Sequence, residues 1–252
     1  SSDLLKKVVS KKPSLFVYSP VNHETGGLQD IKEIFGVCKR SGAVIFIDGV
    51  QAAARLPYED WVPYCDMFTL SGHKICGPKG TGLLWANPEI SLAPFRYGGS
   101  PEQDSPLFPG TGNPPGIAAL GTAISLAESE RREETVVLGS LIKDGLTILD
   151  EHGVTYINES PPGAAPGIVC LSFPWVRSME EFLFFLNRNK IAVSRFSACT
   201  GDIQGESKVL SAMGRGADRS STSVRISCGR ESKRSEWYLL ADVLKTAMKQ
   251  GL

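Results

Sequence analysis

Two polar residues stand at the ends of apolar segments, where an α/β sheet would present them to a ligand. Asp48 closes the run AVIFIDG, residues 43–49, and Lys74 follows DMFTLSG, residues 66–72. A carboxylate beside so apolar a run is costly unless a positive or hydrogen-bonded group faces it. A lysine at a strand end can lose solvation and act as an amine nucleophile. A helix-capping aspartate and a surface lysine are the simpler alternatives.

As a pair, Asp48 and Lys74 supply what pyridoxal 5'-phosphate (PLP) needs. The pyridine nitrogen of PLP pairs with a carboxylate, and its aldehyde reacts with a lysine. The glycine-rich GPKGTG, residues 77–82, lacks the GK[ST] ending of a nucleotide-binding loop. We therefore interpret it as the turn that follows the cofactor lysine.

The segments that would position this pair alternate between strand and helix. Residues 14–20 and 43–49 are short apolar runs, and residues 28–42 between them carry apolar side chains at helical spacing and end in glycine. Strands joined by a helix pair in parallel. Two further apolar runs, 66–72 and 81–87, extend the sheet. The sequence therefore predicts an open α/β sheet, whose strand ends gather ligands.

A long helical segment at about residues 117–151 leads to a second part of the chain. There the order changes to strand (154–159), strand (167–173), helix (179–189), strand (191–196), a glycine-containing loop, strand (223–227) and helix (235–249). This order is typical of an α+β unit. We predict part of a large α/β domain over residues 1–130 and a small carboxy-terminal α+β domain over residues 151–252.

Composition argues against several classes of function. The chain has 27 basic and 27 acidic residues without strong clustering, so neither a nucleic acid nor a membrane surface is an expected partner. No apolar run is long enough to span a bilayer. The six cysteines show no CxxC spacing, which disfavours a metal site or a disulfide framework. We expect an intracellular protein with a small-molecule ligand.

Three linked motifs are similar to the hallmark segments of cysteine desulfurases in the class V aminotransferase group. They are NHETGGLQDI, DGVQAA and SGHKICGPKGTG, and the likeness continues through FPGTGN, SACT and SVRISCGR. The resemblance covers almost the whole chain and implies PLP-dependent fold type I. It also implies an enzyme whose amino-terminal third, with its phosphate-cradling turn, precedes the first residue here. We therefore expect this single chain to be incomplete as an enzyme, and to form a homodimer or associate with a chain that supplies the missing amino-terminal part.

The resemblance assigns roles around the cofactor. Lys74 would hold PLP covalently, and Asp48 would keep the ring nitrogen protonated. Gln51 would hydrogen-bond the phenolic oxygen, while Ser71 and His73 would contact the phosphate.

Further roles follow from the same resemblance. Thr111 would reach the phosphate of a neighbouring subunit, which implies a homodimer, and Arg225 would bind the substrate carboxylate with its two-pronged guanidinium. Cys199 would attack the substrate sulfur and carry a persulfide. His23 stands where the family has an asparagine near the ring, with Asn22 before it, and either could serve. The simpler alternatives are a turn threonine, a solvated arginine, a buried cysteine and a loop histidine.

The implied reaction converts L-cysteine to L-alanine and leaves a persulfide on Cys199. A sulfur-acceptor protein, such as an iron–sulfur scaffold or a tRNA-thiolation protein, would then take the sulfur in the cytoplasm or an organelle matrix. The alternatives within the fold are a selenocysteine lyase, another PLP-dependent C–S lyase and a class V aminotransferase. A non-catalytic scaffold that retains the fold is the alternative of a different class.

Overall fold

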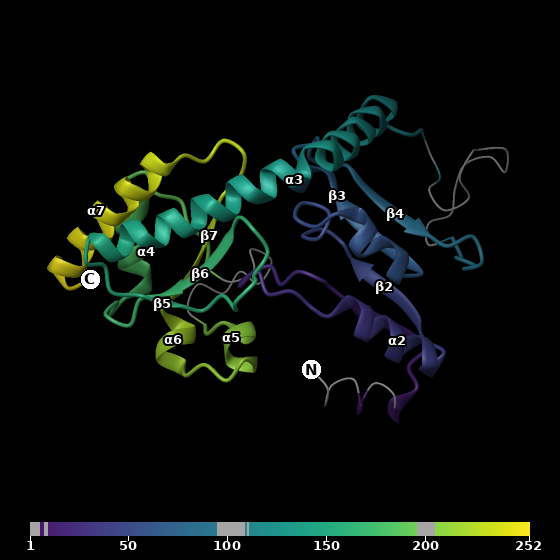
Figure 1. Cartoon of the computed structure of the whole chain (residues 1–252), viewed down its shortest axis with the longest axis horizontal. Coiled ribbons are helices and arrows are strands. Elements are labelled where there is room, and N and C mark those ends of the chain that lie inside the picture. The colour runs from purple at the N-terminus through teal and green to yellow at the C-terminus, as the bar shows by residue number, and fades with distance from the viewer. Residues whose placement is uncertain (1–5, 8–9, 95–108, 110, 196–204) are drawn as a thin grey trace. The chain divides into compact units, whose positions relative to one another are not determined.

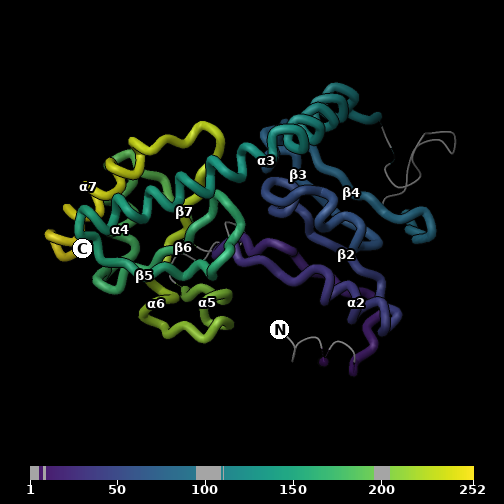
Figure 2. Tube along the Cα trace, viewed as in Figure 1, coloured from purple at the N-terminus to yellow at the C-terminus, as the bar shows by residue number. Residues whose placement is uncertain are grey.

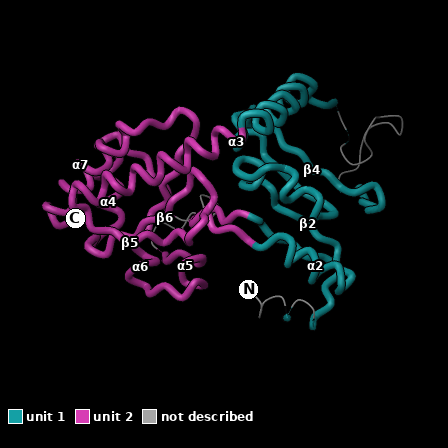
Figure 3. The backbone as a smooth tube through the Cα atoms, viewed as in Figure 1, with its two compact units in different colours: residues 1–20, 30–130 teal, residues 21–29, 131–252 magenta. Residues whose placement is uncertain are grey.

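The computed structural model describes residues 6–7, 10–94, 109, 111–195 and 205–252 of the chain. The chain forms two compact units (Figure 3). Unit 1 comprises residues 1–20 and 30–130, and unit 2 comprises residues 21–29 and 131–252.

The described residues of unit 1 form a sheet of four strands in the order β1-β2-β3-β4, and Figure 1 labels β2, β3 and β4. Strands β1, β2 and β3 pair in parallel, and β4 pairs antiparallel to β3. The strands are β1 (Leu15–Tyr18), β2 (Val44–Asp48), β3 (Met67–Ser71) and β4 (Gly82–Ala86). All four predicted strands of this part are therefore confirmed.

Helix α2 (Ile31–Ser41) links β1 to β2 and has clear start and stop signals. At its start, the Asp30 carboxylate accepts a hydrogen bond of 2.9 Å from the backbone N–H of Glu33. At its end, Gly42 takes the left-handed conformation, with φ of 76°. Three short 3-10 helices follow in unit 1: η1 (Tyr58–Asp60), η2 (Val62–Tyr64) and η3 (Gly72–Ile75).

Helix α3 (Pro114–Glu151) is 38 residues long, and Figure 2 traces it as one continuous coil. Its residues up to 130 belong to unit 1 and the remainder to unit 2. Among the described residues, no helix is both long and apolar enough to cross a membrane.

Unit 2 holds a three-stranded antiparallel sheet in the order β5-β6-β7. All five residues of β6 are buried, so this strand forms the centre of the unit 2 core. Phe173, Phe182 and Leu186 pack in the same core. The elements are β5 (Ile157–Asn158), β6 (Ile168–Ser172), α4 (Met179–Arg188), α5 (Lys208–Ala212), α6 (Ala217–Ser221), β7 (Ser223–Ser227) and α7 (Arg234–Gln250).

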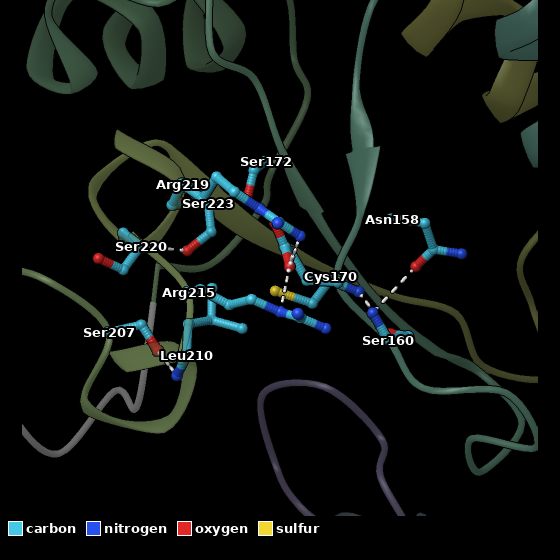
Figure 4. Close-up of polar contacts among 11 residues, drawn as sticks. Asn158, Ser160, Cys170, Ser172, Ser207, Leu210, Arg215, Arg219, Ser220 and Ser223 are labelled. Carbon is cyan, nitrogen blue, oxygen red and sulfur yellow. Dashed lines mark hydrogen bonds and ion pairs between the residues drawn. The ribbon is translucent and has the colours of Figure 1, made fainter. Parts of the chain in front are cut away.

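A buried ion cluster fastens α6 to this sheet (Figure 4). The Glu159 side chain is fully buried and accepts two hydrogen bonds of 2.7 Å from the Arg219 guanidinium. Arg215 lies 3.2 Å from the same carboxylate, and the Ser172 hydroxyl donates to it at 2.8 Å. Hydrogen bonding to Glu159 raises the pKa of Arg219, because the bond favours the charged guanidinium.

Three predictions about the strands and loops of unit 2 were wrong in detail. Residues 191–195 form no strand, and Ser194 makes only an isolated bridge to Arg225. The predicted glycine-containing loop contains α5 and α6 within its described part. Of the predicted strand at residues 154–159, only Ile157–Asn158 pairs with β6.

Candidate active site

The carboxyl ends of β2 and β3 form one polar edge of the unit 1 sheet. Asp48 ends β2 opposite Thr69, and Ser71 ends β3 two positions further along. Side chains alternate across a strand, so Asp48, Thr69 and Ser71 project from the same face. Ile45 and Ile47 project from the opposite face and are fully buried. The sheet thus places a carboxylate and a hydroxyl together on its more exposed face.

The turn after Asp48 is tightly packed. The Asp48 carboxylate accepts a hydrogen bond of 3.1 Å from the N–H of Val50, and it remains exposed. A Cβ at Gly49 would lie 2.7 Å from the Thr69 carbonyl oxygen and 2.8 Å from the Trp61 ring. Only glycine fits here, so the backbone rests directly on the indole. This packing fixes the direction in which the chain leaves the strand.

Gln51 lies in the same turn and is half-buried. Its amide oxygen is 3.4 Å from Nε of Arg55, which donates to it. The amide NH2 group of Gln51 is the donor end of the side chain. A hydrogen-bond donor suits the phenolic oxygen of PLP, which the family resemblance pairs with Gln51.

The turn after β3 presents three polar side chains in succession. The Ser71 hydroxyl and Nδ1 of His73 are hydrogen-bonded at 2.8 Å, and His73 and Lys74 are exposed on η3. Gly72 is buried, and a Cβ there would overlap the Thr81 hydroxyl. The N–H of Gly77 donates to the Gly72 carbonyl at 2.8 Å and closes the turn. A hydroxyl, an imidazole and an amine therefore follow one another on a close-packed turn.

Arg225 is a half-buried residue of β7 in unit 2. Its guanidinium donates to the His23 carbonyl oxygen at 3.0 Å and to the Ser227 hydroxyl at 3.2 Å. Burial lowers the pKa of Arg225, and the nearby Glu24 carboxylate opposes this effect. Arginine stays protonated in proteins, so this position keeps a positive charge.

Asn22 and His23, the two candidates for the position near the cofactor ring, differ in their contacts. The Asn22 side-chain oxygen accepts hydrogen bonds of 2.9 Å from the N–H groups of both Glu24 and Thr25. This is the local turn-forming pattern of asparagine, so the amide oxygen of Asn22 holds its own loop. The His23 side chain is 41% exposed, and its Nε2 lies 3.7 Å from the Glu24 carboxylate.

Sequence reasoning missed Glu24, although it lies in the NHETGG motif. Glu24 is only 6% exposed and accepts a hydrogen bond of 2.5 Å from the Ser207 hydroxyl. The same hydroxyl accepts a hydrogen bond of 3.0 Å from the N–H of Leu210 and so caps α5 (Figure 4). The position of Glu24 inside a motif was the available signal of its importance, but its partner Ser207 is far away in the sequence and could not be predicted.

The predicted site residues fall in both units. Unit 1 holds Asp48, Gln51, Ser71, His73, Lys74 and the exposed Thr111, whereas unit 2 holds Asn22, His23 and Arg225. Cys199 lies outside the described residues. The structure therefore brings together two groups, one at the sheet edge of unit 1 and one around Arg225 in unit 2.

Comparison with known families places these motifs within one family match that covers most of the chain. Residues 1–238 match the family model described as aminotransferase class-V. The chain belongs to this family. The predicted resemblance to class V aminotransferases and cysteine desulfurases is thus confirmed.

Relatives of this class-V aminotransferase chain carry cysteine desulfurase names. It is 37% identical over 230 residues to the putative cysteine desulfurase IscS 1 of Bacillus subtilis, a match that covers 89% of this chain and 60% of that protein. It is 34% identical over 220 residues to the cysteine desulfurase IscS of Anaeromyxobacter dehalogenans, covering 85% and 53%. The chain thus spans little more than half the length of these curated relatives.

Solved structures share its fold. A NifS-like protein from Rickettsia africae matches with a TM-score of 0.85 at 23% identity, over 99% of this chain and 66% of that one. DndA from Streptomyces lividans matches with a TM-score of 0.69 at 27% identity, over 88% and 63%. The predicted fold class, part of PLP-dependent fold type I with a mostly parallel sheet, is confirmed.

Proposed function

We propose that this chain carries the cofactor lysine and the sulfur-transfer residues of a PLP-dependent cysteine desulfurase. The reaction takes L-cysteine to L-alanine and leaves the sulfur as a persulfide on Cys199. The observation that carries the proposal is the polar edge of unit 1. There Asp48 and Ser71 share one face of the sheet, and His73 and Lys74 follow on the next turn.

The chemistry of this edge suits PLP. The exposed Asp48 carboxylate matches a protonated pyridine nitrogen, and the NH2 group of Gln51 matches the phenolic oxygen. Ser71 and His73 offer donors to a phosphate, and the exposed Lys74 offers the amine that reacts with the aldehyde. Bound here, PLP would supply an electron sink that stabilises negative charge on the substrate α-carbon.

The remaining roles belong to side chains of this chain. With PLP bound, Nζ of Lys74 would take the α-proton of the substrate, because a neutral amine is a suitable general base. Arg225 binds the substrate carboxylate, because its planar guanidinium can make two parallel hydrogen bonds to two oxygens. The Cys199 thiolate would attack the substrate sulfur, because only a thiolate is a good nucleophile. The new S–S bond forms as the substrate C–S bond breaks, and the electron pair of that bond stays on the carbon that takes a proton to become the methyl group of alanine.

Partners and compartment follow from this reaction. We infer a homodimer in which Thr111 contacts the phosphate in the neighbouring subunit. A sulfur-acceptor protein, of the iron–sulfur scaffold or tRNA-thiolation type, would take the sulfur from Cys199. A reducing compartment, the cytoplasm or an organelle matrix, suits a reaction that depends on a free thiol.

The cofactor assignment is tested by reduction with borohydride. The purified chain is mixed with PLP, reduced, digested and mapped by mass spectrometry. We expect a visible absorbance band that reduction abolishes and a pyridoxyl group on Lys74. The control is Lys79→Ala, since Lys79 is an exposed lysine of the same glycine-rich turn. Label on Lys79 or on another lysine instead of Lys74 would contradict the assignment, whereas no label at all would mean that this chain does not hold PLP without the amino-terminal part.

The sulfur-transfer role is tested with cysteine labelled with radioactive sulfur. A single turnover should leave label on Cys199 and release one alanine for each sulfur. The matched pair is Cys199→Ser and Cys76→Ser, because Cys76 is an exposed cysteine elsewhere in the chain. We expect the first variant to abolish the persulfide and the second to retain it. If Cys199→Ser still produces alanine at the wild-type rate, the persulfide role of Cys199 is wrong; if it produces pyruvate and sulfide instead, a C–S lyase is the better assignment.

A further inference from the structure

The Arg225 side chain is held by a loop that lies far from it in the sequence. Its Nη1 donates to the His23 carbonyl oxygen at 3.0 Å, and its Nε donates to the Ser227 hydroxyl at 3.2 Å. Ser227 is on the same strand, whereas His23 lies 202 positions earlier, in the segment of residues 21–29 that belongs to unit 2. The direction of the guanidinium therefore depends on where this loop places the His23 carbonyl group.

The backbone of Arg225 is fixed separately, by its neighbours on both sides. Arg225 pairs with Cys170 of β6. On its other side, the Arg225 N–H donates to the Ser194 carbonyl oxygen at 2.6 Å, and the Ser194 N–H donates to the Arg225 carbonyl oxygen at 3.1 Å. The long arginine side chain still has many rotamers to lose. A residue that fixes the loop thus acts on the guanidinium rather than on the strand.

The peptide group that joins His23 to Glu24 is held at both of its polar atoms. Its carbonyl oxygen accepts from Arg225, and its N–H donates to the Asn22 side-chain oxygen at 2.9 Å. The Glu24 side chain then ties this planar peptide to the body of unit 2. Its carboxylate is buried and accepts the Ser207 hydroxyl hydrogen at 2.5 Å.

The charge of Glu24 is more than such a tie requires. A buried carboxylate is costly unless a positive group or hydrogen-bond donors face it, and a neutral amide oxygen could also accept the Ser207 hydrogen. The charge has its counterpart in Arg225. Burial lowers the pKa of this guanidinium, and the Glu24 carboxylate raises it. The carboxylate therefore favours a charged guanidinium that stays beside the loop.

We propose that Glu24 is a positioning residue that fixes the His23–Glu24 peptide and so sets the direction of the Arg225 guanidinium for binding a substrate carboxylate. The inference rests on the proposed function, in which Arg225 binds that carboxylate. Glu24 acts through Arg225 and does not touch the substrate. Two parallel hydrogen bonds to a carboxylate require an aligned guanidinium plane. Loss of Glu24 should therefore weaken the binding of amino acids through their carboxylate alone.

The first measurement needs no cofactor. The Nε–H signal of Arg225 is followed by NMR in the isotopically labelled chain and is identified by its loss in Arg225→Lys. Its exchange with solvent is compared in Glu24→Ala, Glu24→Gln and Glu206→Gln. Glu206 is a matched control, because its exposed carboxylate also accepts a serine hydrogen, from Ser220 at 3.1 Å, in the same unit.

We expect exchange of this Nε–H to be graded across the variants. It should be at least about tenfold faster in Glu24→Ala, because the guanidinium can then turn away from both of these acceptors. In Glu24→Gln it should be about threefold faster, since the amide keeps a hydrogen bond to Ser207 but loses the charge. In Glu206→Gln it should stay within about twofold of the wild type.

The second measurement is calorimetric binding of two probes to the PLP-loaded chain: L-alanine, and ethylamine, which lacks the carboxylate. In Glu24→Ala the Kd for L-alanine should rise by about tenfold, and the Kd for ethylamine should not change. When Arg225→Ala is already present, adding Glu24→Ala should have no further effect on L-alanine binding, because Glu24 acts through Arg225.

Two results would overturn the inference. One is Nε–H exchange within about twofold of the wild type in both Glu24 variants. The other is equal weakening of L-alanine and ethylamine, which would show a merely structural role. If Glu24→Ala does not fold, as judged by circular dichroism, Glu24→Gln decides. A chain whose affinity for L-alanine is unchanged by Arg225→Ala would refute the proposed role of Arg225 itself, whereas the exchange measurement would still decide the role of Glu24.

Discussion

Replacing Glu159 by glutamine should weaken unit 2 more than most single substitutions. The carboxylate is fully buried and faces Arg219 through two bonds of 2.7 Å and Arg215 at 3.2 Å. Glutamine keeps the size but removes the charge and turns an NH2 group toward donors. Removing one partner of a buried ion pair costs about 3–5 kcal/mol.

We expect a cost at the lower end of this range of about 3–5 kcal/mol, because water can reach the two arginine side chains that lose their partner. Arg219 and Arg215 are 27% and 36% exposed, so water offsets part of the loss. We expect the free energy of unfolding to fall by about 3 kcal/mol. For a chain of this size the melting temperature should drop by roughly 6–12 °C.

The assay is urea unfolding followed by circular dichroism, with calorimetry for the melting temperature. Glu151→Gln is the control, because Glu151 is an exposed carboxylate at the end of α3. It should change stability by less than about 0.5 kcal/mol. A loss below about 1 kcal/mol for Glu159→Gln would refute the idea that this buried charge holds α6 on the sheet.

Two other predictions concern glycines and thiols. Gly145→Ala should lower the free energy of unfolding by about 1–3 kcal/mol, because the new Cβ would overlap the Trp237 indole. Gly139→Ala, at a position of the same helix where the Cβ meets open space, should raise the free energy of unfolding by up to about 1 kcal/mol, as measured by urea unfolding. Equal effects of the two would contradict the packing. Burial raises the pKa of Cys65 and of Cys170 to about 12, so both should resist iodoacetamide at pH 8 until urea is added. A thiol in the unfolded chain loses its proton near pH ~8.5, so between this pH and the pKa of the buried thiols the unfolded state binds fewer protons than the folded state. The free energy of unfolding, measured in urea, should therefore fall as the pH rises above about 9. A free energy of unfolding that stays constant over this pH range would count against the burial of these thiols.

Local signals made much of unit 1 predictable. Helix α2 stops at a left-handed glycine, and this glycine was the predicted end of the helical segment. Its strands are short apolar runs closed by polar residues, so their ends were located within about two residues. The candidate residues at those ends, Asp48 and Ser71, lie at one edge because parallel strands end together.

Other features depend on partners far apart in the sequence. The antiparallel direction of β4 is set by pairing with β3, which no local pattern encodes. Residues 191–195 have an apolar, strand-like sequence but pair with β7 only at Ser194. Glu159 meets Arg219 only because α6 folds back over the sheet. Such pairings are decided by tertiary packing, which overrides local propensity.

The dual role of the Ser207 hydroxyl limits which amino acids can stand at that position. The oxygen must donate its hydrogen to Glu24 and accept one from Leu210 at the same time. Aspartate would cap the helix as well as serine does, but it has no hydrogen to give and would set two carboxylates against each other. Alanine would leave the Glu24 carboxylate without this donor. Among the common capping residues, only serine and threonine have a hydroxyl that can both give and receive, so we expect variation at this position to be confined to these two.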